Sequence, residues 1–385
     1  MHNRTEQFLN DPVFPLLIRM SAPNTIAFFI QAIVVLAEVW FISKLGTTSL
    51  AAVALAFPVI MLTQQMAFGA LGGAVTSSIA RSLGAEDKER AEKLLWHSLL
   101  LSCCGYLLFF LIFFIGGESL LMALGGEGSL LEESLLYIKI FLTGAIFIWL
   151  SGTLSAALRG IGNMRFPALL MIAGSGIQVI LAGGLILGWF GLPKLGIIGA
   201  PLSAISVAAL MAIVMILKFM HSSSNVQLKL SNLSFKKELF RDIFNVALPA
   251  SLAPIFTVGT ILILTGLVGQ FGVSALAGYG IGSRIEFLMI PLVFGIGTAM
   301  TTMVGTNIGA KKVERAERIG WLGGSFAGLF SGMIGLILII SSSYWINFFA
   351  TDQATYEVTK QYIEIVGLCF TFQGLGLSLY FASQG

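Results

Sequence analysis

Residues 84–96 read GAEDKERAEKLLW and residues 309–321 read GAKKVERAERIGW, so the same landmarks recur 225 positions later in the chain. The register continues beyond these stretches, with a spacing of 226 before them and 225 after them. The matched pairs are Pro23 and Pro249, Gly46 and Gly272, Phe68-Gly69 and Phe294-Gly295, Tyr137-Ile138 and Tyr362-Ile363, and Gly160 and Gly385. So many unlike residues held in register indicate an internal duplication, and the seam between two such repeats is where function is expected.

The composition places both repeats in a lipid bilayer. Of the 385 residues, 56% are hydrophobic and only 11% are charged, and the mean hydropathy is +0.91. This is too little charge to cover a soluble protein of this length. Continuous apolar runs of roughly 20 residues favour helices over the alternating strands of a barrel. They predict ten membrane helices near 13–42, 50–80, 94–115, 133–158, 167–189, 196–219, 243–268, 275–306, 319–341 and 358–384.

The distribution of Lys and Arg predicts the orientation. The N-terminus and every second connection hold 17 of these residues, whereas the other side holds only Lys44, Lys194 and Lys360. This bias predicts a cytoplasmic N-terminus. The seventh helix then enters from the same side as the first, so the two repeats are parallel. The net charge of +3 reflects this bias and includes no basic block that would bind nucleic acid.

The predicted architecture is an all-α multi-pass membrane protein with an N-lobe and a C-lobe. The N-lobe covers residues 1–220 with six helices, a cytoplasmic linker covers 221–241, and the C-lobe covers 242–385 with four helices. The second repeat ends at the counterpart of Gly160, so it lacks its last two helices. A complete duplication would have about 443 residues, and we expect the chain to be a truncated form of that architecture.

Glu38 is the strongest functional signal, because a charge within an apolar span costs a few kcal/mol. It lies deep in the first helix, and Gln31 lies two turns earlier on the same face. A carboxyl group in such surroundings can bind and release a proton, or ligate Na⁺ together with neighbouring carbonyl groups. The alternative is a glutamate that serves packing alone through a hydrogen bond across a helix interface.

Other polar residues in the spans have weaker signals. Arg284 and Glu286 point to different faces of the eighth helix, and each is expected to find a partner on a neighbouring helix, for bracing or for substrate contact. Lys139 and Glu364 are equivalent in the two repeats and can reach the membrane surface. Neither the three cysteines nor the three histidines form a metal-binding pattern, so no metal is expected beyond a possible Na⁺ at Glu38.

Glycines and prolines inside the spans predict close helix packing and bending. Pro23 and Pro249, and Gly69 and Gly295, are matched pairs that we select as hinge or packing residues. A phosphate-binding loop is the alternative for the glycine clusters, but no Lys-Ser/Thr follows them.

The pattern resembles the multidrug and toxic compound extrusion (MATE) transporters, in their prokaryotic branch. The resemblance rests on Glu38 seven residues before Leu45-Gly46, on Leu50-Ala51-Ala52 and Pro58, and on several later motifs along the whole chain. These motifs are Gly84-Ala85, Arg159-Gly160-Ile161-Gly162-Asn163, Arg284-Ile285-Glu286, Pro291 with Gly295-Ile296-Gly297, and Asn307-Ile308-Gly309-Ala310. The resemblance implies two six-helix lobes that expose a central cavity alternately to each side. It also implies a multi-pass protein of the prokaryotic inner membrane that exports organic cations in exchange for Na⁺ or H⁺.

The family's site residues carry over unevenly. Glu38 stands where the family usually has an Asp, and the polar positions on the fifth and sixth helices align with Gln178, Ala182 and Ala204, so two polar groups are missing. A second branch of the family uses acidic residues on the seventh and tenth helices. This chain has no acid on its seventh helix and Gln373 on its tenth. The resemblance therefore implies a simpler ion site, centred on Glu38 with Gln178 and Gln31, and substrate or bracing contacts at Arg284, Glu286 and Gln373.

The functional hypothesis is a secondary antiporter that needs no cofactor besides its coupling cation, H⁺ or Na⁺. Its expected partners are small organic cations or other amphipathic molecules and the lipid bilayer, and a monomer is the expected state. A lipid-linked precursor flippase of the same broader fold is the alternative, although it would need a cavity rich in Arg and Lys. An embedded enzyme would need convergent catalytic residues that the spans lack. A receptor or channel is disfavoured by the parallel duplication.

Overall fold

The computed structural model describes residues 4–221, 226–349 and 352–385, without the side chains of 273, 285–288 and 348–349. Every regular element in these ranges is a helix. The α-helices are α1 (Arg4–Asn10), α2 (Val13–Ser43), α3 (Thr47–Gln64), α4 (Gly72–Gly84), α5 (Lys88–Ala123), α6 (Gly128–Gly160), α7 (Arg165–Leu187), α8 (Gly199–Met220), α9 (Lys237–Gly269), α10 (Val273–Gly309), α11 (Val313–Ile340), α12 (Ser342–Phe349) and α13 (Gln353–Gln384). A π-helix, η1 (Gln65–Leu71), joins α3 to α4, and short 3₁₀ turns lie at η2 (Trp189–Gly191), η3 (Gly196–Ile198) and η4 (Leu230–Asn232).

Ten of these helical segments are long and apolar enough to cross a membrane, with α3, η1 and α4 forming one span. The predicted all-helical membrane fold with ten spans is confirmed. Several helices begin earlier than their apolar runs, because polar first turns extend them. The Asp87 carboxylate accepts from the Arg90 amide at the start of α5, and Asp352 caps α13 in the same way through Thr355. Hydropathy alone cannot detect such turns.

The duplication is visible in the backbone. Gly46 and Gly272 precede α3 and α10 with φ angles of +129° and +102°, a region that glycine enters without steric cost. Glu86 and Lys311 share a left-handed conformation as well, with φ of 61° and 60°. Each pair has the spacing of the sequence repeat, so the two halves turn their chains in the same way at equivalent points.

Side-chain hydrogen bonds between helices are duplicated too. In each half, the second and fourth long helices exchange two side-chain hydrogen bonds. One hydroxyl on the fourth helix donates to a backbone carbonyl of the second, and one hydroxyl on the second donates to a carbonyl of the fourth. The pairs are Ser134 to Ala52 and Thr359 to Gly278 (3.3 Å each), and Thr76 to Ala156 (3.0 Å) with Thr301 to Phe381 (2.8 Å). Equivalent residues therefore have equivalent partners, and the helices of the two halves pack alike.

The one-residue change in spacing has a structural cause. The spacing is 226 at Gly69 and 225 at Gly84, so the first half contains one more residue between these points than the second. The π-helix Gln65–Leu71 lies just there, whereas α10 continues as an α-helix through the equivalent region. A π-turn absorbs one inserted residue while keeping the helix continuous. The insertion thus leaves the residues after it in the same register in both halves.

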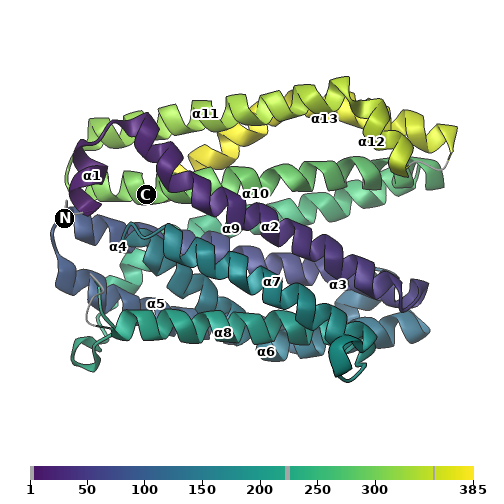
Figure 1. Ribbon diagram of the computed structural model, residues 1–385, viewed down its shortest axis with the longest axis horizontal. Helices are drawn as coiled ribbons and strands as arrows, with labels where there is room; N and C mark the ends of the chain where they lie inside the picture. The colour runs from purple at the N-terminus through teal and green to yellow at the C-terminus, as the bar shows by residue number, and fades with distance from the viewer. Residues whose placement is uncertain (1–3, 222–225, 350–351) are drawn as a thin grey trace.

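Figure 1 shows the long helices side by side, with both termini at the same end of the bundle. We call this the basic end, because the Lys- and Arg-rich turns also lie there. We keep the predicted names N-lobe for α2–α8 and C-lobe for α9–α13, which follow the two halves of the sequence repeat. Helix α2 packs against α7 of its own lobe and against α10 of the C-lobe, while α9 packs against η1 and α4 of the N-lobe. The first long helix of each lobe therefore joins it to the other lobe.

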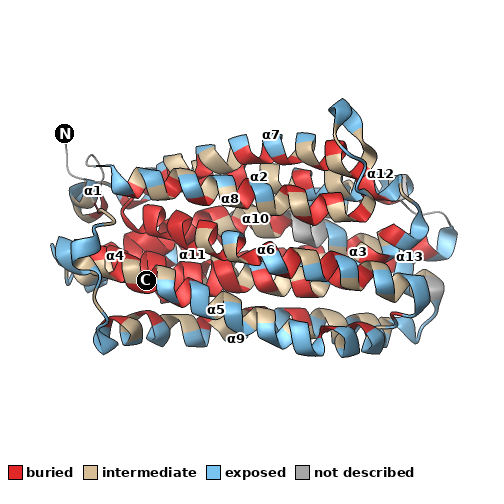
Figure 2. Ribbon diagram, turned by 90° about the horizontal axis from the view of Figure 1, so that it is seen from below, coloured by how far each residue is buried: buried red, intermediate tan, exposed pale blue. Residues whose placement is uncertain are grey.

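Burial is concentrated where the lobes meet, at the basic half of the bundle. Figure 2 shows α4 buried along most of its length, whereas α5 and α9 expose broad faces. The exposed face of α5 includes Leu107, Leu108 and Phe114, all more than half exposed. These apolar faces suit contact with lipid chains.

Two equivalent glycines make the closest approach between the lobes. A Cβ atom on Gly84 of α4 would lie 2.0 Å from the carbonyl oxygen of Thr306 in α10, and a Cβ on Gly309 would lie 2.0 Å from that of Arg81. Gly84 matches Gly309 and Arg81 matches Thr306 in the sequence repeat. The contact is thus reciprocal, and it lets two helix backbones meet directly at the basic end.

Adding a methyl group at this contact should weaken the closed arrangement. We expect Gly84→Ala and Gly309→Ala each to destabilise the protein by about 1–3 kcal/mol, because the backbones must separate. The measurement is thermal unfolding in detergent. Gly116→Ala is the matched control, since that glycine lies in α5 with nothing near its Cβ position. Equal melting shifts in all three variants would contradict the reciprocal contact.

The π-helix leads to a second expectation. Deleting Ala70 should convert η1 to an α-helix and preserve the alignment of Gly84 with Thr306, as in the second half. Deleting Val75 in the adjacent α4 instead rotates everything after it by about 100°. The first deletion should leave most protein folded by size-exclusion chromatography, and the second should not. Equal loss in both would refute this account of the insertion.

Candidate functional site

The Glu38 side chain is half-buried on α2 and faces α7 and α8 of the N-lobe. Its Oε1 atom accepts a hydrogen bond from Gln178 Nε2 on α7 at 2.8 Å. The Ser203 hydroxyl on α8 lies 3.5 Å from the same oxygen. The two polar partners are themselves buried, at 7% and 0% exposure. Three helices therefore place polar groups around one carboxylate inside the membrane span.

Ser203 is a site residue that the sequence reasoning missed. That reasoning aligned Ala204 with the family's polar position on this helix and concluded that the hydroxyl was absent. The residue just before it supplies a hydroxyl, although its shorter bond goes to the Ala200 carbonyl at 2.7 Å. A hydroxyl has one proton to donate, so its 3.5 Å contact with Glu38 is weak while that bond is made.

Gln31 lies in the same polar interface. Its Oε1 atom accepts from the Ser175 hydroxyl of α7 at 3.0 Å. Gln31 and Glu38, two turns apart, share one face of α2, and Ser175 and Gln178, one turn apart, share the facing side of α7. The structure brings the three predicted ion-site residues, Glu38, Gln178 and Gln31, to one interface between α2 and α7.

Tyr137 of α6 is a second neighbour that the sequence reasoning did not select. Its phenol is buried, at 7% exposure, and lies within electrostatic reach of Glu38. Ala182, the other aligned position, is fully buried in an apolar cluster with Phe41 and Ile186. A single sequence gives no reason to select such a tyrosine as a site residue, because most buried aromatic residues serve packing.

The arrangement leaves one carboxylate oxygen available. Both contacts to Glu38 involve Oε1, and the described residues include no hydrogen bond to Oε2 and no basic partner for this carboxylate. They also include no cluster of three or more His, Cys, Asp or Glu that would hold a transition metal. The chemistry available at this site is therefore proton exchange, or coordination of a monovalent cation by carboxylate and neutral oxygens.

The predicted substrate or bracing residues do not converge on Glu38. Arg284 is exposed on α10, and the described side chains include no ion-pair partner for it. The Glu286 side chain lies outside the described residues. Gln373 is half-buried on α13 in the C-lobe. Their roles remain predictions.

The predicted hinge and packing residues behave differently from one another. A Cβ on Gly295 would lie 2.5 Å from the Thr25 backbone, so this glycine permits α10 to contact α2. Gly69 has ordinary space, with its nearest neighbour 3.9 Å away on Phe294. Helices α2 and α9 continue through Pro23 and Pro249 without a break. Hinge roles for these prolines remain predictions.

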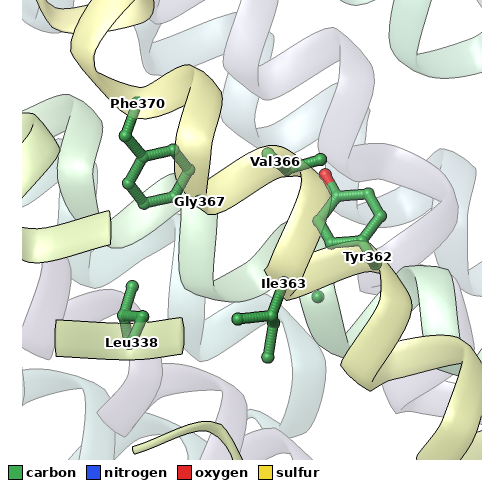
Figure 3. Close-up of a pocket in the computed structure, with 7 residues that line it drawn as sticks. Leu338, Tyr362, Ile363, Val366, Gly367 and Phe370 are labelled. Atoms are coloured by element: carbon green, nitrogen blue, oxygen red, sulfur yellow. The ribbon is translucent and has the colours of Figure 1, made fainter. Parts of the chain in front are cut away.

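The C-lobe contains a small cavity of about 10 Å³ between α10, α11 and α13. Figure 3 shows its apolar lining, which includes Tyr362, Val366 and Phe370. Tyr362 is the counterpart of Tyr137 in the sequence repeat. The counterpart of Glu38, at a spacing of 226, is Leu264 on α9, a helix that does not line this cavity. The C-lobe thus has no carboxylate at the position equivalent to Glu38.

An ion-pair cluster joins the lobes at the basic end. Asp242 on α9 binds Arg81 of α4 at 2.8 Å and Arg90 of α5 at 3.0 Å. Arg81 also donates to the carbonyl of Gly385 at 3.1 Å. Because these residues are partly exposed, the ion pairs contribute little to the free energy of unfolding. Their main effect is to orient α9 against α4 and α5.

The opposite lobe is held in the same manner by α1. The carbonyl of Phe8 accepts from Asn307 at 3.1 Å and from Arg315 at 3.2 Å. Deeper in the bundle, Asn24 of α2 donates to Thr298 of α10 at 3.2 Å. Within the described ranges, the hydrogen bonds between the lobes all lie between this point and the basic end. The half of α2 that carries Glu38 bonds only within its own lobe.

Comparison with known proteins decides the family. The family model described as MatE matches residues 23–182 and 249–385, which is most of the chain. The chain belongs to the MatE family. The predicted resemblance to MATE transporters is therefore confirmed, and the protein is a multi-pass membrane transporter.

Three curated relatives of this MATE chain illustrate its similarity. An "FAD transporter" from Shewanella oneidensis is 26% identical over 385 residues, covering 97% of this chain and 82% of that protein. A "Probable multidrug resistance protein NorM" from Thermotoga maritima is 24% identical over 373 residues, covering 96% and 79%. The "Multidrug export protein MepA" from Staphylococcus aureus is 25% identical over 371 residues, covering 96% and 81%.

Solved structures agree with this placement. A MOP superfamily transporter from Pyrococcus furiosus superimposes with a TM-score of 0.89 at 25% identity, covering 100% of this chain and 85% of that one. A structure described as an outward-facing conformation of a multidrug resistance MATE family transporter superimposes with a TM-score of 0.87 at 25% identity, covering 98% and 84%.

The Glu38–Gln178 contact can be tested energetically. In a double-mutant cycle with Glu38→Leu and Gln178→Leu, we expect a coupling free energy of about 1 kcal/mol, typical of hydrogen bonds between membrane helices. Thermal unfolding in detergent provides the measurement. Glu38→Leu combined with Ser49→Ala is the control, because Ser49 bonds to Glu133 instead. Additive effects in the first cycle would show that the contact is not made.

Proposed function

We propose that this MATE transporter exports small organic compounds in exchange for H⁺ or Na⁺, with the coupling cation bound at Glu38. The family membership supports transport, and the relatives named as multidrug export and resistance proteins support export of drugs. The observation that carries the ion site is a carboxylate inside the membrane span with one oxygen unbonded and no basic partner among the described residues.

Coupling follows from the placement of this carboxylate. Glu38 bonds to α7 and α8 on the part of α2 that makes no described hydrogen bond to the C-lobe. A cation that neutralises Glu38 changes the cost of exposing or burying that part of α2. Exchange then requires only that the cation and the substrate favour different arrangements of the lobes.

The proposal includes orientation and surroundings. The Lys and Arg bias supports a cytoplasmic basic end, so the described arrangement, joined at that end, corresponds to a state closed to the cytoplasm. We place the protein in the prokaryotic cell membrane as a monomer. The proposed cargo is cationic and amphipathic. The chain has 30 Phe and 14 Met residues, which can supply an apolar, polarizable lining for a substrate cavity.

Replacing Glu38 tests the proposal directly. In proteoliposomes with an imposed pH or Na⁺ gradient, Glu38→Gln should reduce gradient-driven movement of a fluorescent organic cation by at least about tenfold, the scale of an energetic coupling between sites. Glu38→Asp, which keeps the carboxylate, should retain part of the activity. Separate gradients identify which cation is exchanged.

The control is Glu133→Gln, which neutralises a carboxylate that bonds to Ser49. Its transport should be close to that of the unmodified protein. Full gradient-driven transport by Glu38→Gln would refute the ion site. Movement of FAD in place of the organic cation would replace the proposed substrate class while leaving the exchange mechanism intact.

A further inference from the structure

The segment between the lobes is fastened to α5 by three side chains. Glu92 is 5% exposed and accepts from the amide of Gln227 at 3.2 Å and from Asn232 at 2.6 Å. Trp96 Nε1 donates to the Lys229 carbonyl at 3.0 Å. The segment therefore has a defined position against the basic end of α5.

His97 fixes the far end of the segment. The Lys236 amide donates to His97 Nε2 at 3.1 Å, which requires that this nitrogen carry no proton. The proton then lies on Nδ1, which donates to the Lys93 carbonyl at 2.7 Å. The ring is 1% exposed and stacks edge-on against Phe240 at 4.5 Å. Both ring nitrogens are used structurally.

A cavity of about 230 Å³ lies between this segment and α5. Its lining is mostly apolar and consists of Trp96, His97, Leu99, Leu100, Cys103, Leu233, Ser234, Phe235 and Phe240. The Ser234 hydroxyl is buried and has no hydrogen-bond partner among the described residues. This oxygen is inaccessible to solvent, so the accessible wall of the cavity is apolar.

The cavity opens onto the lipid-facing side of α5. Leu100 is 38% exposed, Leu107 and Leu108 follow about two turns later at more than half exposure, and Cys103 is exposed between them. The segment adds Phe235, at 72% exposure. A hydrocarbon chain that enters this cavity beside the segment can continue along the exposed apolar face of α5.

Three lysines are close in sequence to the segment residues that line the cavity. Lys229, Lys236 and Lys237 are exposed and have no ion-pair partner among the described residues. The nearby acids are largely engaged, since Glu89 pairs with Lys93 and Glu92 is held by the segment. Glu238 is the remaining exposed acid beside them. Lysines at a membrane surface attract anionic headgroups.

From these observations we infer a binding site for an anionic phospholipid between α5 and the linking segment. One acyl chain occupies the apolar cavity, and the headgroup phosphate lies among Lys229, Lys236 and Lys237. The site is separate from Glu38 and does not depend on the proposed exchange mechanism. Because the lipid would touch both α5 and the chain leading into α9, its occupancy would brace the junction of the lobes.

The test is native mass spectrometry of the purified protein titrated with phosphatidylglycerol or with phosphatidylcholine of identical acyl chains. We expect preferential binding of phosphatidylglycerol. Each of Lys229→Gln, Lys236→Gln and Lys237→Gln should weaken that binding about fivefold. Leu100→Trp fills the cavity without changing charge and should also displace the lipid.

The matched control removes three lysines elsewhere, through Lys44→Gln, Lys194→Gln and Lys360→Gln, and should keep the preference. Equal binding of both lipids would overturn the site, because it indicates only bulk lipid. A preference for phosphatidylglycerol that survives the combined replacement Lys229→Gln, Lys236→Gln and Lys237→Gln would overturn it by placing the lipid elsewhere. Binding unaffected by Leu100→Trp would overturn it by reducing the effect to surface attraction.

Discussion

The direct contact of two helix backbones at Gly84 and Gly309 is the constraint on which the arrangement of the lobes depends. Each glycine faces a carbonyl oxygen of the other helix, at Thr306 and Arg81 respectively. A side chain at either position would hold the helices apart. The ion pairs of Asp242 and the hydrogen bonds of α1 lie at the same end of the bundle. These polar interactions orient the junction, while the two glycines allow the helix backbones to approach closely.

The two lobes are alike in geometry and unlike in chemistry. Hydrogen bonds from Ser134 and Thr359 repeat at equivalent carbonyls, yet only the N-lobe has a carboxylate at the equivalent depth of its first long helix, since Glu38 corresponds to Leu264. The polar partners of Glu38 come from α7 and α8. Duplication thus supplies the scaffold, and later divergence of single residues supplies the candidate ion site in one copy.

Much of this fold could be predicted from the sequence. The spacing of 225–226 residues and the apolar runs predict a duplicated bundle of ten spans, and a glutamate in such a run identifies Glu38. The partner Gln178 followed from the family resemblance. Ser203 and Tyr137 could not be found, because their importance depends on how three helices rotate about their axes, and hydropathy does not specify rotation. The π-helix was hidden as well, although the change in spacing between Gly69 and Gly84 marks its place.

The attachment of α9 at its first turn has a mechanical consequence. Asp242 is bound to the N-lobe and the chain before it is bonded to α5, so the first turns of α9 are attached to the N-lobe. Farther along, the Ala250 carbonyl of α9 accepts a hydrogen bond from Tyr380 of α13 in the C-lobe. The bonds of Phe8 tie the start of the first lobe to α10 and α11 in mirrored fashion. If the lobes move against each other, we expect α2 and α9 to bend. The predicted positions of that bending are Pro23 and Pro249, because a proline inside a helix removes one backbone hydrogen bond.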